Sequence, residues 1–309
     1  MQASSANTQN NRFSVYQTTS LCQTPGCLSP AYVGPNGVAG KYCTKTHKQW
    51  GENGCISCRK APTNGVVVFC QLCYNKALRK APMIVEVPEG HEKYKSVASQ
   101  FRQKWLHNNK CPEVRAIYKI VSTMASLTKY EQYLDRVEAK VNFASQNKPR
   151  GNERRRWHGT TRMCNIGDKG VTKLCSNPSC SLCCIMRTSF DLSFFAKNTR
   201  FGKFGVGIYT SSTSSKSNDY SRNGCISNWK AMLLNKVVVG RGYKMTVSNA
   251  TLTEPPAGYD SVLAEVGTCL NYDELVVYDN NAIRSSYLVI QERVFGYCPR
   301  FTDGSARGL

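Results

Sequence analysis

Apolar residues recur at helical spacing between residues 95 and 146. Residues three or four positions apart share one face of a helix, so each set marks a face that packs on a core. The second set follows Pro112, which suits the first turn of a helix. The sets are Val97, Phe101 and Trp105; Val114, Ile117, Val121 and Met124; and Leu127, Leu134 and Val137. They predict three helices.

The pattern changes after Trp157, where short β-rich runs replace the helical spacing. These runs are Lys236–Val239, Leu275–Tyr278 and Tyr287–Phe295, and turn formers such as those at 254–258 separate them. No long repeated period is visible. The order of elements predicts an α+β fold, with helices that lead into a sheet-rich second half.

Composition divides the chain further. Residues 1–20 are rich in Ser, Asn, Gln and Thr, and we expect them to be disordered. Residues 21–80 hold seven of the sixteen cysteines and many turn formers, which favours a small metal-stabilised module. Two prolines mark 81–94 as a connector. The remaining segments are a helical lead-in at 95–146, a sheet-rich domain at 147–297 and a polar tail at 298–309.

Sixteen cysteines are many for 309 residues. The polar N-terminal segment predicts no secretory signal, and no apolar run reaches the length of a bilayer span. We therefore expect an intracellular protein, cytoplasmic or nuclear, that does not bind membranes. In those compartments closely spaced cysteines favour metal ligation over disulfides.

Ligand pairs in the N-terminal module have two to four residues between them, a spacing that suits tetrahedral zinc. Eight ligands imply two ions, paired either sequentially or in a cross-braced order. The ligands are Cys22, Cys27, Cys43, His47, Cys55, Cys58, Cys70 and Cys73.

A third zinc site is expected in the second half of the chain. Its ligands are Cys164, Cys175, Cys180 and either Cys183 or Cys184. All three sites would be closed and structural, because protein ligands fill them. Four cysteines remain, and we expect each to be buried singly: Cys111, Cys225, Cys269 and Cys298.

Positive charge is spread along the chain, with 41 basic residues against 20 acidic ones. A net charge of +21 attracts polyanions or only maintains solubility. The stretch Asn147–Arg156 predicts a basic loop with Gly and Pro. Its cations are Lys148, Arg150, Arg154, Arg155 and Arg156. They lie either on a solvated surface or near an anionic ligand.

Three segments carry candidate chemistry, although each is weak alone. They are Trp157-His158-Gly159-Thr160, then Gly205–Tyr209 continuing through Ser215-Lys216-Ser217 to Tyr220, and then Asn271–Asp279 with Glu274 at its centre. In this order they resemble the three motifs of the poly(ADP-ribose) polymerase family, tankyrases included. Val114–Ile120 with the tyrosines that follow, and Pro256–Val262, resemble two further motifs of that family.

The resemblance implies a fold and a substrate. The fold would be a split, mostly antiparallel sheet with a helical lead-in, beside the zinc module. NAD would be the substrate. His158 would bond a ribose hydroxyl of its adenosine half, and Gly159, Thr160 and Ser217 would hold the cofactor, the glycine and the serine at its carboxamide. The nicotinamide would lie between Tyr209 and Tyr220.

The resemblance also implies the reaction. Glu274 would act on the nicotinamide ribose, and with His158 and Tyr209 would form the catalytic set that transfers ADP-ribose, as a single unit, to a macromolecular acceptor. That acceptor is a protein such as ubiquitin or a nucleic acid. The alternatives are NAD hydrolysis and a zinc-finger binding protein with an inactive transferase-like domain. The cysteines between His158 and Tyr209 depart from the usual pattern of the family.

Overall fold

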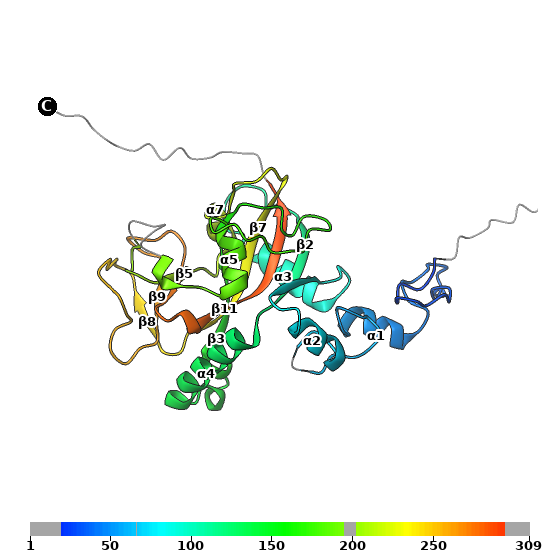
Figure 1. The fold of residues 1–309 in the computed structure, drawn as a ribbon, viewed down its shortest axis with the longest axis horizontal. Coiled ribbons are helices and arrows are strands. Elements are labelled where there is room, and N and C mark those ends of the chain that lie inside the picture. The colour runs from blue at the N-terminus through cyan, green and yellow to red at the C-terminus, as the bar shows by residue number, and fades with distance from the viewer. Residues whose placement is uncertain (1–19, 66, 195–201, 294–309) are drawn as a thin grey trace, which may run out of the picture.

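A five-stranded antiparallel sheet forms the centre of the molecule. The computed structural model describes residues 20–65, 67–194 and 202–293, and Figure 1 shows their arrangement. The strand order is β1-β2-β11-β7-β3, and every neighbouring pair is antiparallel. The strands are β1 (Met83–Glu86), β2 (Val114–Val121), β11 (Ile283–Glu292), β7 (Trp229–Val238) and β3 (Glu153–His158).

A second sheet of four strands stands beside the first, so the β-structure is split in two. Its order is β5-β10-β9-β8, and only the β8–β9 pair is parallel. The strands are β5 (Ile208–Thr210), β10 (Glu274–Val277), β9 (Ser261–Ala264) and β8 (Gly242–Met245). Trp157 and Ser211 form an isolated antiparallel bridge that connects β3 with the end of β5. The described sheets agree with the predicted split, mostly antiparallel core.

Short elements link the two sheets. A parallel two-stranded ribbon joins β4 (Thr161–Arg162) to β6 (Arg222–Asn223). The helical pieces of this half are α5 (Ser181–Thr188), α7 (Ser214–Asp219), η3 (Leu192–Phe194) and η4 (Asn280–Ala282). Figure 1 shows α5 between β5 of the second sheet and β7 of the first.

Helices cover both faces of the five-stranded sheet. Helix α4 (Met124–Val141) is capped by the Thr123 side chain and ends at Asn142 in the left-handed region, with φ of 53°. Its buried side chains join one core cluster with β2, β7 and β11. Helix α3 (Glu92–Gln103) contributes to the cluster on the other face. Two 3-10 turns, η1 (Phe143–Gln146) and η2 (Arg150–Asn152), return the chain from α4 to β3.

The prediction of a helix over Val114–Val121 is wrong, because this stretch forms β2. Its β-branched and aromatic residues are buried at Ile117, Tyr118, Ile120 and Val121, which covers both faces of the strand. A strand buried on both faces loses the simple alternation of polar and apolar residues, and its apolar positions then fit helical spacing as well. The predicted helices around Val97 and Leu134 match α3 and α4.

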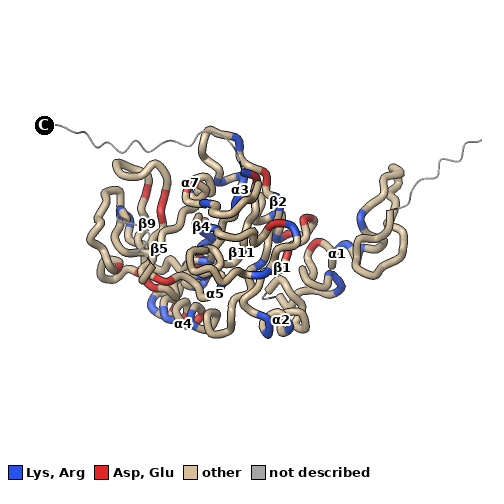
Figure 2. The backbone as a smooth tube through the Cα atoms, turned by 45° about the horizontal axis from the view of Figure 1, so that its top comes forward, with Lys and Arg blue, Asp and Glu red and all other residues tan. Residues whose placement is uncertain are grey.

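Two other stretches also differ from the expectation. The segment 81–94, expected as a connector, contains β1 and the start of α3, so it belongs to the sheet and its cover. The basic stretch Asn147–Arg156 ends as strand rather than loop, since β3 begins at Glu153 and places Arg154–Arg156 in the sheet. Elsewhere Lys and Arg are scattered over most elements (Figure 2).

The cysteine-rich N-terminal region has two parts. The first part, residues 20–53, contains α1 (Lys45–Asn53) and extends away from the sheets (Figure 1). The second part, residues 54–80, contains α2 (Gln71–Leu78), and its Ile56 and Phe69 join the same core cluster as Trp157 of β3. None of the described helices has both the length and the apolar character of a bilayer span.

Candidate active site

Glu274 occupies the first position of β10, beside the junction of the two sheets. Its Oε1 lies 2.8 Å from the Nζ of Lys216, and the two side chains are each 12% exposed. Its second oxygen, Oε2, is buried and has no hydrogen-bond partner within the described residues. A buried carboxylate oxygen without a partner carries a desolvation penalty that a bound hydroxyl group would remove.

Lys216 and Asp273 fix the backbone around Glu274. The Nζ of Lys216 also donates to the carbonyl oxygens of Tyr272 (3.0 Å) and Asp273 (3.3 Å). The Asp273 carboxylate accepts from the Ser211 hydroxyl (3.0 Å) and from the Ser212 backbone N–H (3.0 Å). Burial raises the pKa of Asp273, but these hydrogen bonds outweigh it and hold the pKa below its usual value. The start of β10 is therefore bound to the end of β5.

Tyr209 lies on β5, opposite Val276 of β10. Its hydroxyl accepts from the Phe204 backbone N–H (2.9 Å) and donates to the Gly205 carbonyl oxygen (2.7 Å), so the ring is held from its far end. Gly205 has φ of 75°, and a Cβ there would come within 1.8 Å of a backbone oxygen, so glycine is required. Burial raises the pKa of Tyr209, and the nearby charge of Glu274 adds to that shift.

Tyr220 follows directly after α7 and is 57% exposed. Burial of its phenol oxygen raises its pKa, and the charge of Glu274 again contributes. Tyr209 lies on β5, which pairs with β10, and Tyr220 directly follows α7, whose Lys216 bonds Glu274. The three side chains therefore share one region of the molecule. This region holds two aromatic rings next to one carboxylate.

His158 is the last residue of β3, and its ring is held in one orientation. Its Nδ1 lies 2.9 Å from the Tyr209 carbonyl oxygen, which can only accept, so Nδ1 carries the proton. Phe190 packs edge-on against the ring at 5.1 Å between centroids. Burial lowers the pKa of His158 despite the bond to Tyr209. The ring is therefore neutral near pH 7, and Nε2 remains as an acceptor.

Gly159 and Ser217 bring the end of β3 onto α7. A Cβ added at Gly159 would lie 1.9 Å from the Ser217 carbonyl oxygen, so only glycine allows this approach. The Ser217 side chain is itself buried, at 4% exposure. The carbonyl oxygen of Thr160 accepts from the Arg222 N–H (3.2 Å), which continues the same junction. The structure thus collects the candidate residues of all three motifs at the meeting point of β3, β5, α7 and β10.

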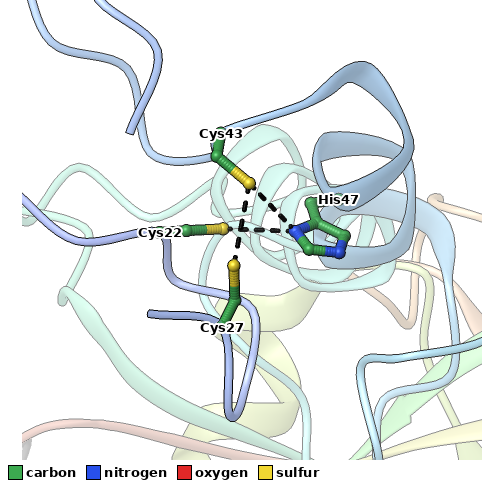
Figure 3. A group of neighbouring side chains, drawn as sticks. All are labelled: Cys22, Cys27, Cys43 and His47. Atoms are coloured by element: carbon green, nitrogen blue, oxygen red, sulfur yellow. Dashed lines mark hydrogen bonds between the residues drawn. The ribbon is translucent and has the colours of Figure 1, made fainter. Parts of the chain in front are cut away.

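The twelve candidate metal ligands form three groups of four. Within each group the ligand atoms all lie within 4.8 Å of one another. The groups are Cys22, Cys27, Cys43 and His47; Cys55, Cys58, Cys70 and Cys73; and Cys164, Cys175, Cys180 and Cys183. The two N-terminal groups follow chain order, which is the sequential pairing. Figure 3 shows the four ligand atoms of the first group pointing toward one another.

The distances suit zinc rather than disulfides. Tetrahedral zinc with Zn–S bonds of about 2.3 Å places sulfur atoms about 3.8 Å apart. The Sγ atoms of Cys27 and Cys43 are 3.7 Å apart. The Sγ atom of Cys164 is 3.9 Å from that of Cys180 and 3.6 Å from that of Cys183. A disulfide requires about 2.05 Å.

The third group lies close in the chain to a residue that contacts the candidate active site. It joins Cys164, just after β4, to Cys180 and Cys183 at α5. The chain that leaves α5 carries Phe190, the residue that packs on His158. Cys184 lies outside the group, with its Sγ near the carbonyl oxygens of residues 177 and 178.

The other candidates raised by the sequence have ordinary positions. Glu265, a carboxylate that directly follows β9, pairs with Lys244 at 2.8 Å on the surface, where its side chain is 46% exposed. Cys111, Cys225 and Cys269 are half-buried outside the three groups, and Cys298 lies outside the described residues.

The sequence patterns do not identify Lys216 and Asp273 as the residues that position Glu274. Lys216 lies within the Ser215-Lys216-Ser217 motif, but its partner Glu274 lies 58 positions further along the chain, so no local pattern connects them. Asp273 was visible only as the neighbour of Glu274. One sequence signal connects Lys216 with Asp273. It is the lysine between two serines, followed later in the chain by an acidic pair that directly precedes a β-rich run.

Comparison with known proteins agrees with this geometry. The family model described as "Poly(ADP-ribose) polymerase catalytic domain" matches residues 91–268. The human protein mono-ADP-ribosyltransferase PARP4 is 35% identical over 98 residues, which cover 30% of this chain and 6% of that protein. The mouse protein mono-ADP-ribosyltransferase PARP3 is 25% identical over 177 residues, which cover 57% of this chain and 26% of that protein.

The matches have definite limits. The chain spans only 6% and 26% of the lengths of those two relatives. The family match includes His158, Tyr209 and Ser217 but ends six positions before Glu274. It begins after the two N-terminal metal groups. The family match therefore does not include Glu274.

Proposed function

The chain belongs to the poly(ADP-ribose) polymerase catalytic domain family, and from this premise we propose that it transfers a single ADP-ribose unit from NAD to a macromolecular acceptor. The relatives PARP4 and PARP3 are named as protein mono-ADP-ribosyltransferases, which supports transfer of one unit. The observation that carries the proposal is the buried carboxylate of Glu274, which has one oxygen bound to Lys216 and one oxygen unpartnered.

NAD is oriented by groups that the structure brings together. The Nε2 of His158 accepts a hydrogen bond from a ribose hydroxyl of the adenosine half, because Nδ1 is already bound to Tyr209. The backbone of Gly159 and the hydroxyl of Ser217 hold the carboxamide of the nicotinamide, next to Thr160. The rings of Tyr209 and Tyr220 stack on the nicotinamide. These contacts fix the leaving group before the bond breaks.

Glu274 acts on the ribose that loses nicotinamide. Cleavage of the glycosidic bond develops positive charge on that ribose, as in glycoside hydrolysis. The free oxygen of Glu274 accepts from the 2′-hydroxyl, and its charge favours the cationic transition state over the ground state. The acceptor nucleophile attacks the anomeric carbon as nicotinamide departs with the bonding electron pair. Glu274 polarises that nucleophile as a base.

Lys216 is the positioning residue of this mechanism. Its Nζ bonds one carboxylate oxygen and two backbone carbonyl oxygens, which fixes where the other oxygen points. A carboxylate whose cation is itself fixed by two further hydrogen bonds needs little reorganisation when charge develops on the ribose.

Zinc supports this site and does no chemistry in it. We propose one ion in each of the three groups of four ligands. When bound, zinc supplies only the tetrahedral link between chain segments, because four protein ligands leave no open position. The residues of the third group then hold α5, and through it Phe190, against His158.

The first metal group belongs to a part of the chain that selects the acceptor. Residues 20–53 extend from the body (Figure 1) and expose apolar side chains, among them Leu28 at 84% and Tyr32 at 62%. Several large exposed apolar side chains in one small part of the chain favour contact with a protein partner. We therefore favour a protein acceptor over a nucleic acid.

The activity is tested by nicotinamide release and acceptor labelling. Glu274→Gln keeps the size of the side chain but removes its charge, so transfer should fall by about a hundredfold or more, some 2.7 kcal/mol, with NAD binding nearly unchanged. Glu265→Gln is the matched control and should behave as the unmodified protein. Near-normal nicotinamide release by Glu274→Gln would refute the assignment. Labelled NAD in a lysate, followed by protease or nuclease digestion, identifies the acceptor class.

A further inference from the structure

A second set of charges in the five-stranded sheet lacks full compensation. Arg155 of β3 stands directly opposite Lys236 of β7, and Lys236 stands directly opposite Arg284 of β11. Like charges in directly opposite positions of neighbouring strands destabilise a sheet. This row of three cations is unfavourable in the free protein unless anions lie beside it.

Groups of the protein balance only part of this charge. Glu153 lies 2.7 Å from Lys236 and also accepts from the hydroxyl of Tyr130. Arg284 stacks over the Tyr130 ring at 5.0 Å, and its Nε is buried without a hydrogen-bond partner in the described chain. The Nη2 atom of Arg155 is also buried without a hydrogen-bond partner in the described chain. Two buried guanidinium nitrogens therefore have no hydrogen-bond acceptor among the described residues.

Lys119 of β2 is a fourth basic residue near this row, although its direct partner on β11 is Tyr287. Its Nζ donates to the carbonyl oxygen (3.0 Å) and the hydroxyl (3.2 Å) of Ser286, and it has no ion pair among the described residues. Burial, followed by the charges of Arg284 and Lys236, holds the pKa of Lys119 well below its usual range. An anion beside these groups would favour the charged amine.

Three of these cations, all except Arg155, border a cavity of about 610 Å³. Lys119, Lys236 and Arg284 line it from the sheet, and Phe69 and Tyr74 line it from the second cysteine-rich part. The two aromatic rings are stacked, with centroids 6.2 Å apart. A cavity of this volume takes a nucleotide-sized ligand. Cations bind phosphates, and an aromatic wall stacks on a base.

The acidic residues of the cavity do not cancel its positive side. Glu131 and Asp135 are both bound to Arg150, and Glu153 is bound to Lys236. Lys119 and Arg284 therefore line the cavity without an ion pair among the described residues. The cavity is also distinct from the NAD site. Arg155 and His158 are three positions apart on β3, so their side chains point to opposite faces of the sheet.

We propose that this cavity is a second ligand site, which binds a mononucleotide carrying two or more phosphates. The phosphates lie on Lys119, Lys236 and Arg284, and the base lies against Tyr74. The transfer reaction neither requires this site nor predicts it. Because the second cysteine-rich part forms one wall, binding there also reports on the integrity of that part.

Calorimetric titration of the full chain with ADP tests the proposal. ADP also fits the adenosine half of the NAD site, so the titration is run in the His158→Ala variant as well as in the unmodified protein. Binding to the cavity should persist in His158→Ala. Arg284→Met and Lys119→Met should each weaken it by about tenfold or more, since each removes a charge-assisted bond to phosphate. Lys129→Met, an exposed residue of α4 outside the cavity, is the matched control.

Thermal melting without ligand provides an independent readout. Removing one of several like charges relieves repulsion, so Arg284→Met and Lys119→Met should melt at the same or a higher temperature than the unmodified protein. The rise in melting temperature caused by ADP should disappear in both. ADP binding that is lost in His158→Ala but unchanged in Arg284→Met would overturn the proposal. So would binding of a 5′-phosphorylated oligonucleotide without binding of ADP, or no binding of either.

Discussion

The Glu274 region and the three metal groups differ in whether their polar atoms all have partners. In each metal group all four ligand atoms point toward one another, within 4.8 Å, so a single ion satisfies the set. Around Glu274 the structure satisfies one carboxylate oxygen through Lys216 and leaves the other unpartnered. A closed group of ligands stabilises the chain, whereas an unpartnered oxygen leaves a position that a substrate hydroxyl can fill.

Within the metal groups there is a second contrast, which gives the largest expected effect. Cys55 is fully buried in the core cluster that includes Trp157 of β3. The ligands of the first group, Cys43 among them, lie outside the core clusters of the described residues. Structural zinc contributes on the order of 10 kcal/mol to the folding of small modules. Loss of the second group should therefore reach the sheet.

The matched variants Cys43→Ser and Cys55→Ser test this contrast. Each should lose about one equivalent of zinc in elemental analysis. Cys55→Ser should lower the melting temperature of the sheet-containing domain by many degrees and reduce nicotinamide release, whereas Cys43→Ser should leave both nearly unchanged. Equal effects of the two variants would show that the two cysteine-rich parts fold as one unit. A chain without residues 1–53 should likewise still cleave NAD.

The next effect concerns the ion pair that holds Glu274. Lys216 and Glu274 are each 12% exposed, so Lys216→Met leaves a nearly buried carboxylate without its cation, at a cost of about 3 kcal/mol in the free energy of unfolding. The surface pair of Lys244 and Glu265 is the control, and Lys244→Met should cost at most about 1 kcal/mol. Chemical denaturation measures both.

Turnover distinguishes positioning from stability alone. If Lys216 only stabilised the fold, the surviving folded protein would retain kcat at low temperature. We expect kcat to fall while KM for NAD changes little, because the free oxygen of Glu274 loses its fixed direction. Unchanged kcat in Lys216→Met would remove Lys216 from the mechanism.

These positions show what the sequence could predict and what it could not. Helices α3 and α4 follow from clear helical periods. The short β-rich runs predict β10 and the second half of β11, but only the last three residues of β7. The strand Val114–Val121 was mistaken for a helix because burial on both faces removes the period of two. The candidate ligands were visible by spacing, but their grouping depends on how the chain returns in space. The unpartnered oxygen of Glu274 and the row of cations at Lys236 exist only across strands.

A smaller effect is expected at Gly159, where the backbone of β3 approaches α7. An added Cβ would lie 1.9 Å from the Ser217 carbonyl oxygen, so Gly159→Ala must displace backbone, at a cost of about 2 kcal/mol. Because the same segment holds the carboxamide of NAD in our mechanism, KM should rise. Gly90→Ala is the control, since a Cβ there meets nothing within 4 Å. Normal KM in Gly159→Ala would mean that the cofactor does not contact this loop.

The smallest effect is a pH dependence, and it concerns the neutral ring of His158. Burial lowers its pKa below the ordinary value of 6.5, and the bond to Tyr209 only partly opposes this. Above pH 6.5 the ring is neutral in both folded and unfolded chains. As the pH falls below 6.5 the unfolded chain takes up the proton first, so the free energy of unfolding decreases until the folded ring is also protonated. His91 is also buried, and its pKa is lowered too, so it contributes a decrease of the same sign.

Denaturation at several pH values, compared between the unmodified protein and His158→Gln, isolates the part of the decrease that belongs to His158. The decrease should be shallower in the variant. Identical pH profiles would mean that His158 is not held neutral, and its Nε2 would then not be available as the acceptor for a ribose hydroxyl.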